Sequence, residues 1–240
     1  MLPVDFHCHS FLSNCGLHSH LELLTRARDL GMTALAITDH GTEGGGRLVG
    51  GFFQRLHEPL PGIRLLKGVE ANPRGLDGDS DLPLHHLPTM DIVLFGLHGT
   101  IPRNLGHDRN TDIVIAAMSA QPAIDIIAHP TATEFPLDFP RLARAAAAQG
   151  VALEVNNSKL HLQRIPEDMM HALLRACIAA DCRVTINSDA HAINEVGRDI
   201  EARAALAAVD FPSELIINDT PERALAFVAE RRPAKLAAST

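Results

Sequence analysis

The sequence predicts an α/β fold in which successive βα units close into a single-domain, TIM-like barrel. Short apolar runs recur at intervals of roughly 30 residues, at 4–6, 34–37, 63–66, 92–97, 123–128, 151–155, 183–186 and 215–217. Most are apolar throughout rather than alternating, which is typical of parallel strands covered on both faces. Helical segments lie between several of them. These two observations favour a (β/α) barrel over residues 1–240, with a doubly wound open sheet as the alternative.

The helical segments have recognisable ends. Ser19 and Glu22 form a capping-box pattern, and Gly31 follows as a stop signal. A last helix is expected to begin after Thr220, with Pro221 in its first position. Similar signals predict helices over 110–120, 139–149, 166–180 and 195–209. The segments 41–51 and 72–88 are rich in Gly, Pro, Asp or His and are expected to be loops over the active-site end. The three glycines at 44–46 lack the order of a dinucleotide fingerprint.

Composition narrows the class of protein. The 21 basic and 29 acidic residues give a net charge of −8, which argues against nucleic acid or an anionic membrane as partner and favours a small substrate. No apolar stretch approaches the roughly 18 residues of a membrane span, and the first residues carry no basic leader, so we expect a cytoplasmic protein. Cys8, Cys15, Cys177 and Cys182 form no C-x-x-C pair and are expected to be reduced.

Metal-ligand side chains follow six of the predicted strands. In a parallel barrel, the residues after each strand meet at one mouth. Those positions hold His7, His9, Asp39, His40, Glu70, His98, His129, Asp189 and His191. Imidazoles and carboxylates suit zinc, manganese or iron, and so many groups exceed what one ion can use. Two or three ions are therefore predicted. Alternate residues of a strand face one side, so His7 and His9 face together and Cys8 faces away.

Such a cluster favours hydrolysis of a phosphate ester. A carboxylate such as Glu70 or Asp189 can bridge two cations, which activate a water and neutralise phosphoryl oxygens. Other polar residues remain open. His85 and His86 could reach the mouth from their loop. The basic residues after strand ends are either phosphate ligands or solvated charges; they are Arg103, Arg109, Lys159 and Arg164. We read His57, His161 and His171 as ordinary helix or loop residues.

Six motifs resemble those of the polymerase and histidinol phosphatase (PHP) superfamily in order and spacing. They are His7-Cys-His9, Ile37-Thr-Asp-His40, Gly68-Val-Glu70-Ala-Asn, Gly96-Leu-His98, Ala128-His129-Pro130 and Ser188-Asp189-Ala-His191. The likeness runs from residue 2 to about residue 217 and is closest to the YcdX-type phosphatases. It implies a distorted (β/α)7 barrel, which puts the eighth strand in doubt. It also implies three divalent transition-metal ions, with zinc favoured and manganese or iron as alternatives.

The resemblance also implies a ligand set and catalytic residues. The implied ligands are His7, His9, Cys15, His40, Glu70, His98, His129, Asp189 and His191. Glu70 is the bridging carboxylate and is catalytic together with Asp189 and His191. The sequence departs from the closest pattern at Cys15, where those relatives have a histidine. A thiolate can substitute and biases the site toward zinc; His18 or His20 could instead complete the set.

The predicted function is hydrolysis of a small phosphorylated metabolite by a phosphomonoesterase whose nucleophile is a metal-bound hydroxide at a trinuclear site. Two alternatives remain open: a histidinol-phosphate phosphatase, and a non-catalytic, metal-binding regulatory PHP domain. The complete ligand set argues against the regulatory alternative. Neither the substrate nor the oligomeric state can be read from the sequence.

Overall fold

Seven parallel strands form one sheet that curls into a nearly closed barrel. The computed structural model describes residues 1–103 and 105–238. Each strand pairs in parallel with the next in sequence order, from first to last. The strands are β1 (Val4–Asp5), β2 (Ala34–Ile37), β3 (Arg64–Ala71), β4 (Ile92–Phe95), β5 (Ile126–Ile127), β6 (Ala152–Asn156) and β7 (Val184–Asn187). This order confirms the (β/α)7 barrel and excludes the open doubly wound sheet.

The predicted eighth strand over 215–217 is wrong. Two short 3-10 helices, η2 (Ser213–Leu215) and η3 (Ile217–Asp219), occupy this segment, and only Ile216 forms a single bridge to β7. The Asn218 side chain takes the place of a pairing strand. Its Oδ1 accepts from the Ile186 amide at 2.9 Å, and its Nδ2 donates to the Val4 carbonyl at 2.9 Å. One side-chain amide therefore links the β7 and β1 edges of the sheet.

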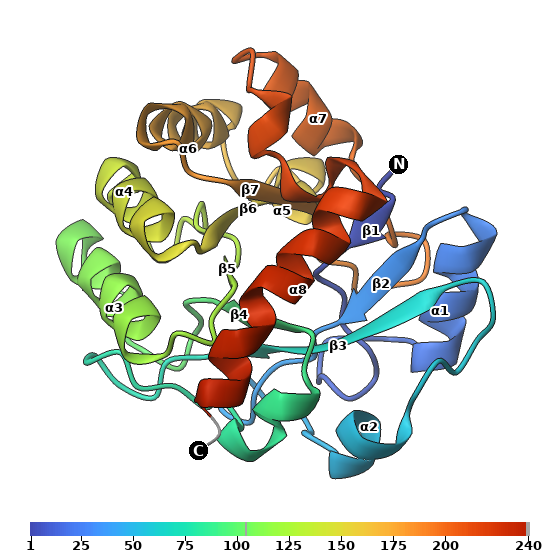
Figure 1. Cartoon of the computed structure of the whole chain (residues 1–240). Helices are drawn as coiled ribbons and strands as arrows, with labels where there is room; N and C mark the ends of the chain where they lie inside the picture. Colours follow the sequence, from blue (N-terminus) through green and yellow to red (C-terminus); the bar gives the residue numbers. More distant parts are fainter. Residues whose placement is uncertain (104, 239–240) are drawn as a thin grey trace.

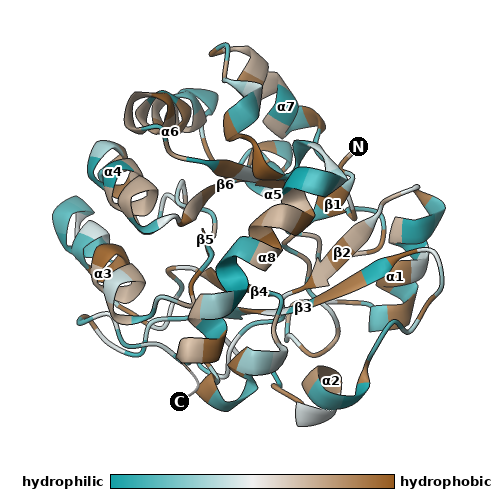
Figure 2. Ribbon diagram, viewed as in Figure 1, coloured by the Kyte–Doolittle hydropathy of each residue, from teal (hydrophilic) through white to brown (hydrophobic). Residues whose placement is uncertain are grey.

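Helices surround the barrel (Figure 1). They are α1 (His20–Asp29), α2 (Gly50–Arg55), α3 (His107–Ala120), α4 (Phe139–Gln149), α5 (Asn157–His161), α6 (Glu167–Ala180), α7 (Ile200–Ala207) and α8 (Pro221–Ala237). Hydrophilic residues lie on the outer sides of α3 and α4 (Figure 2). In the part of the chain that the structure describes, no helix is both long enough and apolar enough to cross a membrane.

Most predicted helix ends are confirmed. The capping box of Ser19 and Glu22 opens α1, and Gly150 ends α4 in the left-handed conformation at φ 65°. The helix predicted over 195–209 starts only at Ile200. The Glu195 carboxylate instead accepts the backbone N–H of His191 at 2.8 Å, which holds the preceding segment in a turn. The segments 41–51 and 72–88 are largely irregular, although α2 begins in the first and the 3-10 helix η1 (Leu84–Thr89) lies in the second.

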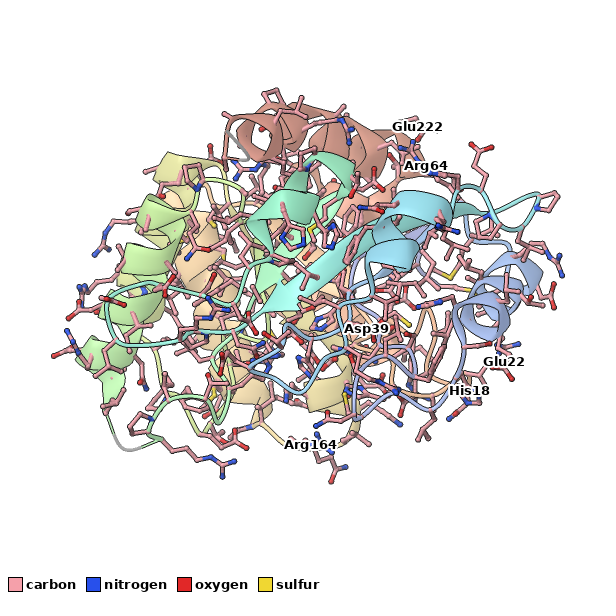
Figure 3. All side chains as sticks on the ribbon, turned by 90° about the horizontal axis from the view of Figure 1, so that it is seen from below. His18, Glu22, Asp39, Arg64, Arg164 and Glu222 are labelled. Atoms are coloured by element: carbon pink, nitrogen blue, oxygen red, sulfur yellow. The ribbon has the colours of Figure 1, made fainter. Side chains whose placement is uncertain are left out.

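Helix α8 closes the amino end of the barrel. Its Phe227 packs against Phe6 of the barrel interior, with ring centroids 6.4 Å apart. Asp125 directly precedes β5 and receives the Lys235 ammonium at 2.7 Å and Arg231 Nε at 3.1 Å. Figure 3 shows the two ends: Arg64 and Glu222 lie on one side of the barrel, and His18 and Arg164 lie on the other. The carboxyl ends of the strands therefore face the side that α8 leaves open.

Candidate metal centre

Glu70 lies at the centre of a ring of histidines. Its side chain, at the end of β3, is fully buried. Oε1 lies 2.8 Å from His129 Nε2 and 3.3 Å from His98 Nε2. Oε2 lies 3.0 Å from His40 Nδ1 and 3.4 Å from His7 Nε2. The two oxygens thus face different sets of imidazoles, which is the arrangement that a bridging carboxylate requires.

Asp189 is a second carboxylate that lies beside His7 and His9. Its Oδ1 lies 3.5 Å from His7 Nε2 and 3.3 Å from His9 Nε2. These two Nε2 atoms are themselves 3.0 Å apart. The His191 ring stacks on His9 at 4.5 Å and lies with Nδ1 3.7 Å from Asp189 Oδ1. Residues that follow β1 and β7 therefore share one cluster with Glu70 of β3.

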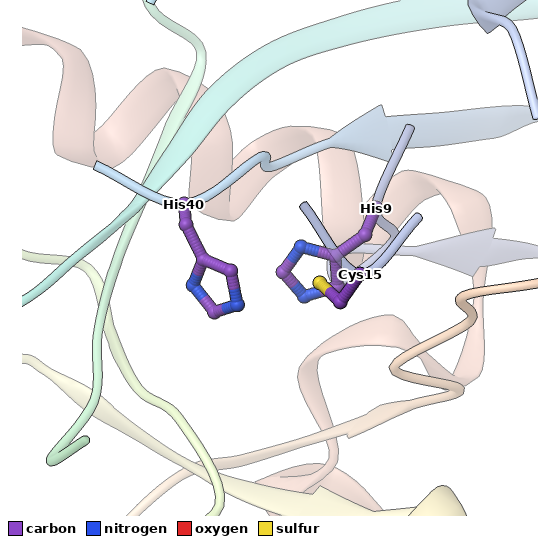
Figure 4. A group of neighbouring side chains, drawn as sticks. All are labelled: His9, Cys15 and His40. Carbon is purple, nitrogen blue, oxygen red and sulfur yellow. The ribbon is translucent and has the colours of Figure 1, made fainter. Parts of the chain in front are cut away.

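Cys15 lies in this cluster, whereas His18 and His20 do not. Figure 4 shows His9, Cys15 and His40 pointing toward one another, and their ligand atoms lie within 4.8 Å of each other. His20 instead bonds Ser10 Oγ at 3.1 Å. Two further compact sets overlap the first: His7, His9 and Asp189, and His40, Glu70 and His98. The predicted residues are thus brought together, with His129 and His191 at the edges.

The electrostatics favour the ionised forms of Glu70 and Cys15. Burial raises the pKa of Glu70, but the neighbouring His98, His7 and His40 outweigh it and hold that pKa well below its usual range. Burial likewise opposes ionisation of Cys15, yet hydrogen bonds with His191 and His40 lower its pKa to about 7. Carboxylate and thiolate forms are the metal-binding forms of these groups.

The unpaired atoms also fit metal ions. Glu70 Oε2 and His40 Nδ1 are buried and lie 3.0 Å apart, yet neither atom makes a hydrogen bond of acceptable geometry. His98 Nδ1 is also buried without a partner. Buried polar atoms are rarely left unpaired because this costs free energy. Lone-pair donors that converge in this way suit divalent cations.

Asp39, expected among the strand-end groups of the mouth, supports the site without joining it. Its carboxylate accepts Ser10 Oγ at 2.6 Å and Ser13 Oγ at 2.7 Å, which fixes the turn after His9. Ser13 Oγ in turn accepts the His40 backbone N–H at 3.0 Å. Asp39 therefore holds the β1 and β2 ends in register.

The backbone is adapted to the centre at three positions. His129 and Asp189 adopt left-handed conformations, with φ of 30° and 51°. Such values are uncommon for non-glycine residues and cluster at functional sites. A Cβ at Gly96 would lie 2.8 Å from His98 Cε1 and 2.9 Å from Glu70 Oε1, so only glycine leaves room there.

The other predicted residues lie around or away from the centre. His86 packs on Phe53 at 4.8 Å and His85 lies against His86 at 4.0 Å, so neither imidazole of η1 joins the cluster. Arg164 and Arg103 are exposed. A pocket of 380 Å³ opens beside the cluster and is lined by Asn14, His40, Glu43, Gly44, Gly45, His98, Gly99 and Thr100. The predicted 41–51 loop therefore does border the site. A larger pocket of 680 Å³, near Arg74 and the end of α8, contains none of the clustered ligand atoms.

No role at the site is predicted for Glu154 from the sequence. This buried carboxylate lies on β6 and accepts His7 Nδ1 at 2.7 Å. The signal was present, because Glu154 is the one charged residue in the otherwise apolar run 151–155. The run as a whole predicts a core strand, which gives no reason to expect a site residue in it.

Comparison with known proteins decides the family. Residues 5–127 match the family model of the PHP domain. The "Probable phosphatase YcdX" of Escherichia coli O81 (strain ED1a) is 34% identical over 243 residues, covering 99% of this chain and 98% of that protein. The chain belongs to the PHP family. The resemblance predicted from six motifs is thereby confirmed.

Two further proteins resemble this PHP chain. The "Probable phosphatase" of Citrobacter koseri is 34% identical over 235 residues, which is 96% of each chain. The histidinol phosphate phosphatase of Lactococcus lactis, solved with zinc, L-histidinol and phosphate, has a TM-score of 0.63. The match covers 87% of this chain and 94% of the Lactococcus lactis chain at 17% identity, so the two proteins share the fold.

Proposed function

We propose that this protein is a metal-dependent phosphomonoesterase that hydrolyses a small phosphorylated metabolite at the cluster around Glu70. The observation that carries the proposal is the pair of buried carboxylates, Glu70 and Asp189, ringed by six histidines and the Cys15 thiol. Its relatives named as probable phosphatases support the same reaction class. The zinc, L-histidinol and phosphate bound by the Lactococcus lactis protein agree with a metal-assisted phosphatase on this fold.

The proposed centre holds three divalent ions, with zinc favoured by the thiolate ligand. The proposed ligands are His7, His9, Cys15, His40, Glu70, His98, His129, Asp189 and His191. When bound, such ions supply an activated water and neutralise the charge of the phosphoryl oxygens.

The chain's own residues provide the framework for that chemistry. Glu70 directs one oxygen toward His129 and His98 and the other toward His40, so it is the bridging group. Asp189 provides the second carboxylate, which lies beside His7 and His9. Because both carboxylates are buried, bulk water does not screen their charge.

The adjacent pocket is suited to a small, polar leaving group. Its volume is 380 Å³, and its wall includes Glu43, Thr100 and three glycines but no aromatic side chain other than the two histidines. Such a wall offers hydrogen bonds and close backbone approach rather than stacking. We therefore expect phosphomonoesters of small hydroxylated compounds, and not diesters of long chains, to be substrates.

Purified protein tests the proposal directly. We expect two or three transition-metal ions per chain by elemental analysis, and hydrolysis of p-nitrophenyl phosphate above pH 7. Chelation should abolish the activity, zinc should restore it, and the diester bis-p-nitrophenyl phosphate should react far more slowly. Less than one ion per chain would contradict the metal centre. Metal without turnover across a panel of phosphate esters, histidinol phosphate included, would favour the non-catalytic alternative.

A further inference from the structure

Glu154 is surrounded by hydrogen-bond donors from four parts of the barrel. Its Oε1 accepts His7 Nδ1 at 2.7 Å and Asn187 Nδ2 at 2.8 Å. Its Oε2 accepts the His129 backbone N–H at 2.6 Å and Asn156 Nδ2 at 2.9 Å. The side chain is fully buried. An ionised carboxylate has about four acceptor positions, and here four donors use them.

This environment selects a carboxylate over its closest uncharged analogue. A glutamine keeps the size and shape but replaces one oxygen with an NH2 group, which only donates. That group would have to face either His7 Nδ1 or the His129 N–H. In the second orientation the NH2 group would face two other donors, the His129 N–H and Asn156 Nδ2. The first opposes the Asn187 Nδ2 donor, and it allows a hydrogen bond to His7 only if that ring carries its proton on Nε2 instead of Nδ1.

We propose that Glu154 is a positioning residue of the metal centre, which fixes the proton of His7 on Nδ1 and so leaves Nε2 free as a metal ligand. His7 Nε2 faces the bridging region, 3.4 Å from Glu70 Oε2 and 3.5 Å from Asp189 Oδ1. A carboxylate that receives the outer N–H of a metal-binding histidine orients the ring and raises its basicity. The inference rests on the metal centre proposed above.

Glu154 also supports a second proposed ligand, through the main chain. His129 has a φ of 30°, a conformation that persists only when its surroundings hold it. The contact from its N–H to Glu154 Oε2 supplies such a restraint directly at the strained residue. The His129 ring then meets Glu70 Oε1 at 2.8 Å. One carboxylate on β6 thus aims imidazoles that follow β1 and β5.

The test measures zinc affinity by competition with a chelating dye, with no substrate present. It compares the wild type with Glu154→Gln and with a matched control variant, Glu201→Gln. Glu201 accepts Arg198 at 2.8 Å and Asn157 at 3.0 Å, and it contacts none of the proposed ligands. We expect Glu154→Gln to bind zinc about 10- to 100-fold more weakly, the usual effect of losing such a partner, and Glu201→Gln to bind like the wild type.

Circular dichroism and thermal unfolding of the metal-free variants separate positioning from simple packing. Wild-type zinc affinity in folded Glu154→Gln would overturn the inference, even if the variant were less stable. If Glu154→Gln does not fold, Glu154→Asp replaces it, since the shorter carboxylate keeps the charge but draws back from His7. Full affinity in that variant would overturn the inference equally. Absence of zinc from the wild type would instead overturn the proposed function.

Discussion

The two ends of the barrel both bury carboxylates but give them different partners. At the amino end, Asp125 is held by Lys235 at 2.7 Å, by Arg231 at 3.1 Å and by the Val93 amide at 2.8 Å. At the carboxyl end, Glu70 meets only imidazoles, and its Oε2 makes no hydrogen bond. Permanent cations neutralise the first carboxylate, whereas the second keeps its charge among groups that also carry lone pairs.

The pKa values follow this difference in part. Burial outweighs the nearby Lys235 and Arg231 and raises the pKa of Asp125. For Glu70, the surrounding histidines outweigh burial and lower the pKa. A buried charge with permanent counter-ions ties elements together, as Asp125 ties α8 to β5. A buried charge that faces only imidazoles is costly unless protons on those imidazoles or bound metal ions balance it. A buried carboxylate therefore stabilises the fold at the amino end, as Asp125 does, and is suited to binding metal at the carboxyl end, as Glu70 is.

The largest effect is expected from Glu70→Gln. The amide cannot bridge ions as a carboxylate does, and the lost stabilisation of several kcal/mol corresponds to a fall in kcat/KM of about 10³-fold or more. Elemental analysis should show fewer ions per chain, while circular dichroism of the metal-free protein should stay like the wild type. Near-normal turnover with a full metal complement would refute the bridging role.

Asp125→Asn is the corresponding change at the amino end, and it should affect stability alone. It leaves the Lys235 ammonium, which is 1% exposed, without its counter-charge. Removing one partner of such a buried pair costs about 3–5 kcal/mol, measurable by urea unfolding. The zinc content and kcat of the folded fraction should match the wild type. A loss of metal at unchanged stability would contradict the division of roles between the two ends.

Gly96→Ala should disturb the centre through volume rather than charge. The added methyl would approach His98, Glu70 and His129 to 2.8–2.9 Å, and overpacking of this kind costs about 1–3 kcal/mol. Zinc binding should weaken by one to two orders of magnitude by the same dye competition. Gly99→Ala is the matched control, because a Cβ at that position meets nothing within 4 Å. Equal zinc affinities in the two variants would contradict this prediction, because the ligands would then have moved to accommodate the methyl group without loss of binding.

The sequence predicted the barrel and the members of the cluster because both depend on local periodicity. Each βα unit places the next residues at the same mouth, so His40, Glu70 and His98 could be assigned to one site from spacing alone. It did not predict that Asn218 would replace a strand. That depends on the width of the gap between β1 and β7, which only the closed barrel defines.

Glu154 was missed for a related reason. Strand periodicity shows that a charged residue is buried but not what it meets, and its partners come from residues 7, 129, 156 and 187. The left-handed backbone of His129 and Asp189 was equally hidden, since neither residue is a glycine. Contacts among several strand ends, and the backbone strain that they support, thus lie beyond what a linear pattern can predict.

The smallest of these effects is expected from Cys15→Ser, which tests whether Cys15 is a ligand of the metal centre. The thiol is half-buried beside His9 and His40, and its pKa of about 7 makes a thiolate accessible at neutral pH. A serine hydroxyl stays protonated and is a poor zinc ligand, so we expect roughly tenfold weaker zinc binding and a smaller preference for zinc over manganese. His18→Ala should change neither. Loss of metal in His18→Ala with full binding in Cys15→Ser would transfer the role to His18 and require the 13–18 turn to rearrange.

Cys15→His should retain binding and reduce the preference for zinc, because an imidazole is a harder ligand than a thiolate.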